Sequence, residues 1–309
     1  MKKILLAGQV PQDCIEMLEN KFELFKLYEA ANRDAFLLEH GDKIDGVTGG
    51  RIDAELISQL PNLKVIANYG VGYDNVDVGA ASTRGIRVSN TPNRLNAAVA
   101  ELTVGLMVSL AREIPSNHAY VKSGRWASEG QTPLTAQLAG ARVGILGLGR
   151  IGKAIAVRLT AFDMEVSYHG RTHQKDQPYH YFDDLTDMAK NVDWLVVIAP
   201  GGEGTHKIIT REVLQALGAN GSFVNIARGN MVDQDALIDL LSNGGLRGAA
   251  LDVFDGEPEV PEALRMLDNV ILSPHKGSAT RQTRAQMSSQ VVENLVAYFE
   301  KGELLDPVI

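Results

Sequence analysis

The sequence predicts an α/β protein with two doubly wound parallel sheets, on three observations. Short apolar strand patterns alternate with helix patterns along the 309 residues, which is typical of parallel sheets. The length allows two domains with separate hydrophobic cores. A glycine-rich turn between a buried strand pattern and a helix pattern occurs once, at residues 142–152.

The first part of the chain reads as a small doubly wound unit. Strands are expected at residues 3–7, 22–27, 46–48, 64–67 and 86–88, and helices near residues 12–20, 53–59 and 76–83. These runs are short and apolar, as in strands that are covered on both faces of a sheet. This part contains no glycine-rich phosphate-binding turn.

A long apolar helix pattern at residues 97–111 separates this unit from the rest. Its polar members, among them Asn96 and Glu101, favour a buried helix over a membrane span. Six further strands are expected at residues 143–146, 164–168, 194–199, 222–226, 248–253 and 270–272. That number suits a complete dinucleotide-binding sheet. A last helix is expected at about residues 282–301, and the sequence does not indicate what it packs against.

The turn at residues 142–152 has the spacing of a dinucleotide fingerprint. Gly147 permits the tight turn, Gly149 allows close backbone approach to a pyrophosphate, and Gly152 lets the helix pack on the strand. Arg150 and Ile151 begin that helix, whose free N–H groups and positive dipole end would meet the phosphates. The alternative, a glycine-rich hairpin, is disfavoured by the helical pattern that follows. We therefore predict a Rossmann domain.

The residues after the second strand of this domain indicate which dinucleotide it prefers. An NAD-specific protein usually places an Asp or Glu there to accept from the ribose 2′-hydroxyl. This chain has His169, Gly170, Arg171 and Thr172 instead. Arg171 offers a permanently charged fork for a 2′-phosphate, so NADP(H) is preferred and NAD(H) remains possible. The alternative is an ordinary solvated Arg in a polar loop.

Composition excludes several classes of partner and site. The chain is 45% hydrophobic and 22% charged, which is ordinary globular usage, and its net charge of −8 opposes binding to nucleic acid. Cys14 is the single cysteine, which excludes an internal disulfide and a cysteine-based zinc site, and we expect it to be packed as a small hydrophobe. No metal site is predicted. No signal peptide or membrane segment is predicted, which favours the cytoplasm.

Three charged residues each lie just past the end of a predicted strand of the second sheet. Arg228 follows residues 222–226, Glu257 follows residues 248–253, and His275 follows residues 270–272. Each of them alone would be an ordinary surface residue. Ligands of open parallel sheets bind outside the carboxyl ends of the strands, so the three are expected to gather beside the dinucleotide.

Seven stretches of the chain carry motifs of a known protein family. The matching stretches are residues 68–77 (NYGVGYDNVD), 90–93 (NTPN), 100–103 (AELT), 144–152 (GILGLGRIG), 225–229 (NIARG), 250–254 with 257–258, and 273–280 (SPHKGSAT). Together they resemble the D-2-hydroxyacid dehydrogenases, in the branch of glyoxylate and hydroxypyruvate reductases. The resemblance implies a Rossmann cofactor domain, residues 97–281, inserted into a smaller flavodoxin-like substrate domain, residues 1–96 plus 282–309. It also implies a hinged cleft and a homodimer.

The resemblance assigns catalytic roles that the chemistry supports. His275 would be the general acid of 2-oxo acid reduction, and Glu257 would orient its ring and favour the imidazolium. Arg228 would hold the substrate carboxylate and polarise the carbonyl. Backbone N–H groups of Val71 and Gly72 would take the remaining carboxylate oxygen.

The resemblance also implies contacts around these groups. Asp252 would hold the nicotinamide carboxamide, although it could merely cap a turn. Further cofactor contacts are expected from Thr103, Pro200, Ile226 and Gly277. Trp126 would line the substrate pocket, in one version from the partner subunit, or it would be an interface aromatic. Lys276 departs from the small or apolar residue that is usual after the catalytic His. It would tune that His or attract anionic substrates, or it is simply solvated.

The implied reaction is the NADPH-dependent reduction of small 2-oxo acids, glyoxylate and hydroxypyruvate, to glycolate and D-glycerate. Two alternatives remain open. One is another dehydrogenase of the same chemistry, of the D-lactate or phosphoglycerate type and linked to NAD. The other is a nucleotide-sensing co-repressor, which the lack of basic or low-complexity tails disfavours.

Overall fold

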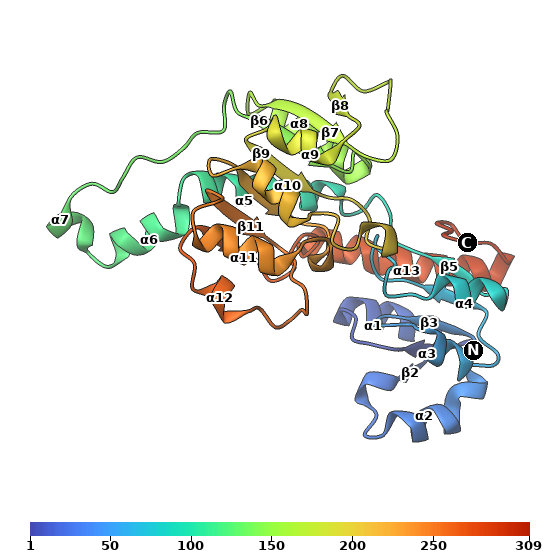
Figure 1. Cartoon of the computed structure of the whole chain (residues 1–309). Helices are drawn as coiled ribbons and strands as arrows, with labels where there is room; N and C mark the ends of the chain where they lie inside the picture. The colour runs from blue at the N-terminus through green and yellow to red at the C-terminus, as the bar shows by residue number, and fades with distance from the viewer. The chain divides into compact units, whose positions relative to one another are not determined.

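The computed structural model describes residues 1–309, which divide into two compact units (Figure 1). The first unit contains Met1–Leu95 and Ala279–Ile309, and the second contains Asn96–Ser278. Each unit has one parallel sheet, of five strands in the first and seven in the second. The predicted α/β fold with two parallel sheets is therefore confirmed.

The sheet of the first unit has the order β2-β1-β3-β4-β5. Its strands are β1 (Lys3–Leu6), β2 (Glu23–Lys26), β3 (Gly46–Thr48), β4 (Val65–Ala67) and β5 (Arg87–Ser89). Its helices are α1 (Gln12–Glu19), α2 (Arg33–His40), α3 (Ala54–Ser58), α4 (Val78–Thr83) and α13 (Arg281–Lys301), with short 3₁₀ turns η1 (Leu27–Glu29) and η2 (Gly41–Lys43). Helix α2 was not predicted because it buries only Leu37 and so lacks an apolar stripe.

Two apolar clusters cover the two faces of this sheet. Helices α1 and α13 supply one of them through Cys14, Leu18, Val291 and Leu295, which pack on Ile4 and its neighbours. The other cluster packs against α3 and α4. Cys14 is fully buried, as predicted for a packed small hydrophobe, and this burial raises the pKa of its thiol to about 12.

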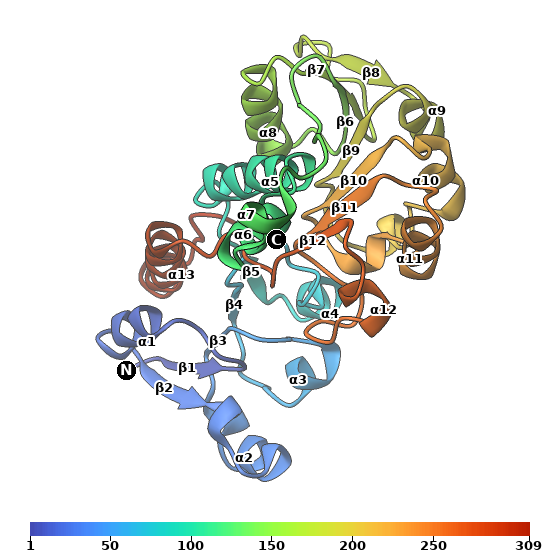
Figure 2. The same ribbon diagram turned by 90° about the vertical axis from the view of Figure 1, so that its left-hand side faces the viewer.

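The sheet of the second unit has the order β12-β11-β10-β9-β6-β7-β8, which can be followed in Figure 2. Its strands are β6 (Arg142–Leu146), β7 (Glu165–His169), β8 (His180–Phe182), β9 (Trp194–Val197), β10 (Ser222–Asn225), β11 (Gly248–Leu251) and β12 (Val270–Leu272). Strand β8 was missed, because this three-residue edge strand is only partly buried and has no apolar run.

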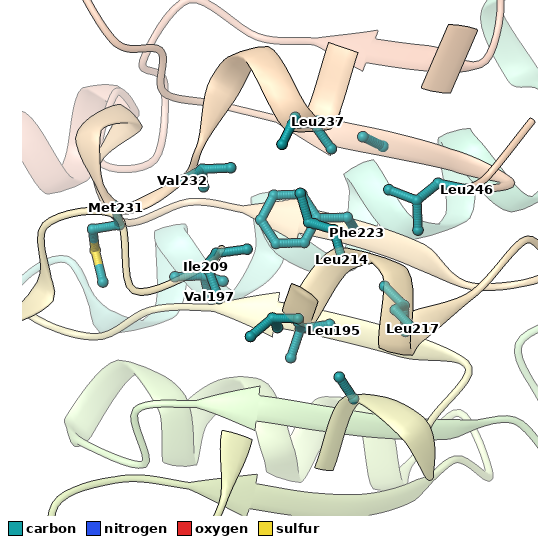
Figure 3. Close-up of a cluster of buried hydrophobic side chains, with 14 of the residues drawn as sticks. Leu195, Val197, Ile209, Leu214, Leu217, Phe223, Met231, Val232, Leu237 and Leu246 are labelled. Atoms are coloured by element: carbon teal, nitrogen blue, oxygen red, sulfur yellow. The ribbon is translucent and has the colours of Figure 1, made fainter. Parts of the chain in front are cut away.

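The second unit contains eight α-helices. They are α5 (Asn96–Ala111), α6 (Ile114–Lys122), α7 (Arg125–Glu129), α8 (Arg150–Thr160), α9 (Leu185–Lys190), α10 (Arg211–Leu217), α11 (Gln234–Ser242) and α12 (Glu262–Arg265), with 3₁₀ turns η3 (Glu203–Thr205) and η4 (Gly229–Met231). Figure 2 shows α5 and α8 on one face and α9, α10 and α11 on the other. Phe223 of β10 and Leu214 of α10, both labelled in Figure 3, belong to the same core cluster as Leu237 of α11.

Residues 112–137, which we call the arm, extend away from the sheet of their own unit (Figure 1). Arg112 Nε donates to Thr135 Oγ1 at 3.0 Å, and Ala136 N donates to Ala111 O at 3.0 Å, so the arm leaves and returns at one place. Helices α6 and α7 in the arm have no buried residue. Across the whole chain, no helix has the length and apolar character needed to cross a membrane.

Candidate active site

The three fingerprint glycines have different surroundings between β6 and α8. Gly147 has φ +101°, and a Cβ there would lie 2.8 Å from Ala199 Cα. A Cβ on Gly152 would overlap the carbonyl oxygen of Gly147. At Gly149, by contrast, no atom lies within 4 Å of the Cβ position. The turn is thus packed tightly on its inner side and open at Gly149, where the fingerprint places the pyrophosphate.

The amino end of α8 is suited to hold that anion. The helix begins at Arg150 after Gly149, and no side chain caps it. Its first N–H groups therefore have no side-chain acceptor, and the positive end of the helix dipole lies at the open glycine. Arg150 is exposed and Ile151 is half-buried at this first turn. These residues fit a dinucleotide phosphate.

The loop after β7 contains the residues expected to choose between NADP and NAD. Arg171 and Thr172 are exposed and follow Gly170 directly. Gln174, which sequence reasoning missed, connects this loop to the phosphate turn, because its Nε2 donates to Leu148 O at 2.9 Å. Its signal in the sequence is too weak to find, since any polar loop residue would look the same.

His173 lies in the same loop and stacks on Tyr181. The two ring centroids are 4.9 Å apart, and the rings are inclined by 5°. The loop that carries Arg171 is therefore supported from β8, the strand that was not predicted.

The predicted catalytic pair is formed within the second unit. His275 Nδ1 lies 2.7 Å from Glu257 Oε2, and Glu257 Oε1 accepts from Phe254 N at 2.9 Å. Burial by itself would raise the pKa of Glu257, but these hydrogen bonds and the charges of His275 and Arg228 outweigh it and lower the pKa below its usual value.

This pairing determines which ring nitrogen is available for chemistry. An ionised Glu257 can only accept, so Nδ1 of His275 carries a proton and donates it to the carboxylate. Nε2 has no partner within the protein, and 51% of the His275 side chain is exposed. A bound carbonyl oxygen could therefore exchange a proton with Nε2.

The loop that carries His275 is held by Asp252, whose exposed fraction is 1%. Its carboxylate accepts from Ser273 Oγ at 2.5 Å, from Lys276 N at 2.7 Å and from Gly277 N at 2.8 Å. His275 has φ +50°, and its N–H donates to Asp252 O at 2.9 Å. Asp252 thus stabilises an unusual backbone conformation at His275. Its contact with a carboxamide stays a prediction.

Arg228 lies in the turn after β10, half-buried. Asn225 Nδ2 donates to Arg228 O at 2.9 Å, and Arg228 Nη1 donates to Ala227 O at 2.7 Å. A Cβ on the following Gly229 would overlap the backbone of Phe254, so the turns after β10 and β11 are in direct contact. This contact brings the charge of Arg228 close enough to Glu257 to help lower its pKa.

The other predicted site residues occupy varied positions. Thr103 is fully buried, and its hydroxyl donates to Val99 O at 2.7 Å. Pro200 is exposed and Ile226 is buried. Lys276 is exposed, although its backbone N–H donates to Asp252. Trp126 lies on α7 in the arm with 53% exposure. The roles assigned to these residues stay predictions.

Val71 and Gly72 belong to the first unit, in the turn after β4. Both are half-buried, and neither backbone N–H donates to an acceptor in the protein. These two N–H groups are therefore available to a ligand.

Comparison with known proteins supplies relatives of this chain. Residues 104–277 match the family described as D-isomer specific 2-hydroxyacid dehydrogenase, NAD binding domain. Glyoxylate/hydroxypyruvate reductase A of Arabidopsis thaliana is 45% identical over 295 residues, which cover 94% of each chain. Hydroxyphenylpyruvate reductase of Plectranthus scutellarioides is 44% identical over 296 residues, again 94% of each.

A solved structure is similar over nearly the full length. The NADPH-dependent glyoxylate/hydroxypyruvate reductase of Sinorhizobium meliloti, in complex with NADP and malonate, has a TM-score of 0.93 at 41% identity. The match covers 99% of this chain and 96% of that one.

Proposed function

The chain belongs to the D-isomer specific 2-hydroxyacid dehydrogenases, and on that premise we propose that it reduces glyoxylate and hydroxypyruvate with NADPH to glycolate and D-glycerate. The observation that carries this proposal is the His275–Glu257 pair at 2.7 Å, which leaves Nε2 of His275 available. An imidazolium with one open N–H is a suitable acid for a carbonyl oxygen near neutral pH.

Each residue of the set then has a chemical task. Reduced NADP, when bound, supplies the hydride that the carbonyl carbon receives. His275 donates the Nε2 proton to the carbonyl oxygen, and Glu257 stabilises the cationic ring before that transfer. Arg228 pairs with the substrate carboxylate, and its charge is present at every working pH. The lowered pKa of Glu257 keeps the carboxylate ionised where the imidazolium is needed.

The cofactor preference rests on Arg171 and Thr172, which are exposed directly after β7 with no carboxylate beside them in the sequence. Arg171 would bind the 2′-phosphate as a planar fork. The Sinorhizobium meliloti relative has NADP bound and is named NADPH-dependent, which supports the same preference here. NAD(H) remains a possible second cofactor.

The two units would divide the work between substrate and cofactor. The second unit, with its open Gly149, would be the cofactor domain. The first unit would be the substrate domain, and its Val71 and Gly72 amides would bind a carboxylate oxygen of the substrate. This assignment follows the family resemblance and the available N–H groups.

A homodimer is part of the proposal. The arm exposes large apolar side chains, namely Ile114 (47%), Val121 (54%), Trp126 (53%) and Leu134 (100%). Apolar side chains exposed on an extension of this kind indicate a protein interface. Trp126 of the second copy would then line the substrate pocket. Light scattering of the wild type and of Leu134→Asp tests the dimer.

Turnover is the test of the function. The purified protein is mixed with NADPH and a panel of 2-oxo acids, and loss of the reduced cofactor is followed by absorbance. Glyoxylate and hydroxypyruvate should be reduced faster than pyruvate or 3-phosphohydroxypyruvate, and faster with NADPH than with NADH. Hydroxyphenylpyruvate belongs in the panel because of the Plectranthus scutellarioides relative. Turnover of none of these acids with either cofactor would refute the proposal.

A further inference from the structure

The turn after β4 has an unusual hydrogen-bond pattern at residues 70–72. Three consecutive carbonyl oxygens in it are bound by side-chain amides. Asn68 Nδ2 donates to Gly70 O at 3.1 Å and to Gly72 O at 2.8 Å. Asn90 Nδ2 donates to Val71 O at 2.8 Å. Thr91 N adds a second bond to Gly70 O at 3.0 Å.

Holding these carbonyls determines where the neighbouring N–H groups point. In a planar trans peptide the C=O and the N–H point in opposite directions. The bonds to Gly70 O therefore direct the N–H of Val71 away from Asn68, and the bond to Val71 O directs the N–H of Gly72 away from Asn90. Neither of these N–H groups has an acceptor in the protein. The side chains thus prepare a pair of free donors.

The amide of Asn68 is itself held in one orientation. Its exposed fraction is 2%, and its Oδ1 accepts from Asn75 Nδ2 at 3.0 Å. Asn75 Nδ2 also donates to Gly50 O at 2.6 Å, which connects the turn to the end of β3. With its oxygen occupied by a donor, Asn68 can present only its nitrogen to the two carbonyls. A buried amide with all of its groups bonded is costly to replace.

We propose that Asn68 and Asn90 are positioning residues for substrate binding, which hold the Val71 and Gly72 amides in the direction that receives a carboxylate. The inference rests on the proposed function, because it takes these amides as carboxylate donors. It adds two residues outside the catalytic set. It also predicts that their loss weakens carboxylate binding without weakening cofactor binding.

The experiment compares three variants. Asn90→Ala removes only the bond to Val71 O. Asn68→Asp replaces the donor that faces Gly70 O and Gly72 O with an acceptor. Asn62→Ala is the matched control, because Asn62 Nδ2 also donates to a backbone carbonyl of this unit, that of Asp42, at 2.6 Å, and not to a carbonyl of the turn.

Calorimetric binding of oxalate, a planar analogue of glyoxylate, is the first measurement. It is accompanied by NADPH binding, the melting temperature, and KM and kcat for glyoxylate. Asn90→Ala and Asn68→Asp should raise the Kd for oxalate about 10- to 100-fold, the usual effect of losing well-placed donors to a charged group. KM should rise more than kcat falls. NADPH binding should stay within about twofold, and Asn62→Ala should match the wild type.

Each outcome decides the proposal. Unchanged oxalate affinity in Asn90→Ala would overturn it, as would equal losses of oxalate and NADPH affinity, which indicate a merely structural turn. If Asn68→Asp does not fold, Asn90→Ala still decides. Failure of the proposed function is a different result, namely a wild type that turns over no 2-oxo acid. Oxalate binding separates the two because it requires no turnover.

Discussion

The two units have related sheet topologies, and in each the strand order reverses at one place, the switch point. The packing at the switch point differs between them. The strand order reverses between β1 and β3 in the first unit and between β6 and β9 in the second. Ligands of open parallel sheets bind at such a point. In the first unit the space is filled by backbone, since a Cβ on Gly8 would lie 2.6 Å from Gly50 Cα. In the second unit Gly149 has no neighbour within 4 Å of its Cβ position.

In both units the topology provides a location for a ligand, and the local packing decides whether a ligand can use it. The second unit joins an open glycine to the uncapped start of α8, which is a general site for phosphate. The first unit closes its switch point and prepares a pair of amides after β4 instead, held by Asn68 and Asn90. The second unit would thus bind a phosphate at the start of α8. The first unit would bind a carboxylate at the turn after β4, which is supported by side chains.

The largest effect is expected from the proton donor of the second unit. His275→Gln should lower kcat for glyoxylate by about 10² to 10⁴, the usual contribution of a general acid. NADPH affinity, measured by fluorescence titration, should change little because the glycine turn is unaffected. A kcat close to that of the wild type would show that His275 is not the proton donor, and the second unit would then have no assigned general acid.

A pair of glycine variants tests the comparison of the switch points directly. Gly149→Val should fold normally, since its side chain enters open space, but it should weaken NADPH binding about 10-fold or more by displacing hydrogen-bonded phosphate. Gly8→Ala should lower stability by about 1–3 kcal/mol through overpacking against Gly50 and leave NADPH affinity unchanged. Denaturant unfolding and cofactor titration of both variants measure this. A loss of affinity in Gly8→Ala would mean that the first unit also takes part in nucleotide binding.

The ion pair of the second unit should control the pH dependence. The pKa of Glu257 is lowered, so its carboxylate is already ionised below its ordinary titration range and accepts a hydrogen bond from Nδ1 of His275. Gln in place of Glu keeps the shape of the side chain and removes the negative charge that Nδ1 of His275 contacts. Glu257→Gln should therefore lower kcat/KM for reduction about 10-fold. It should also remove the fall of kcat/KM at acidic pH that accompanies protonation of the Glu257 carboxylate.

The same pair has a linked effect on folding. Because the folded pKa of Glu257 lies below its unfolded value, its stabilising contribution is present above the unfolded value and is lost as the pH falls through the folded value.

A pH profile of kcat/KM that is identical in Glu257→Gln and in the wild type would contradict the role of this pair in catalysis.

Sequence reasoning found the features that repeat with a known period or spacing. The two parallel sheets are confirmed by the structure, and the family resemblance is confirmed by the comparisons. His275 and Glu257 lie within hydrogen-bond distance, and their catalytic roles stay predictions. Helix α2 and strand β8 were missed because they bury too little apolar surface to produce a pattern.

The residues that hold the site in place could not be predicted from the sequence, for a different reason. Asn68 and Ser273 act through atoms that become neighbours only when the chain is folded. Asn68 lies inside a recognised motif, but the sequence does not indicate that its side-chain amide donates to the carbonyls two and four residues later. Ser273 bonds a carboxylate 21 residues away. Motif spacing indicates which groups meet a ligand, whereas tertiary hydrogen bonds determine what holds those groups in place.

The smallest effect is expected at the loop after β7, where the second unit would distinguish its cofactors. Arg171→Ala should weaken NADPH binding several-fold and leave NADH nearly unaffected, because only NADPH offers a 2′-phosphate to the guanidinium. Arg51→Ala, an exposed Arg of the first unit, is the control and should change neither affinity. The effect is modest because Arg171 is exposed and water screens the pair. Equal losses for both cofactors would show that Arg171 supports the loop and does not select the nucleotide, and the preference would then have to come from another residue of this edge.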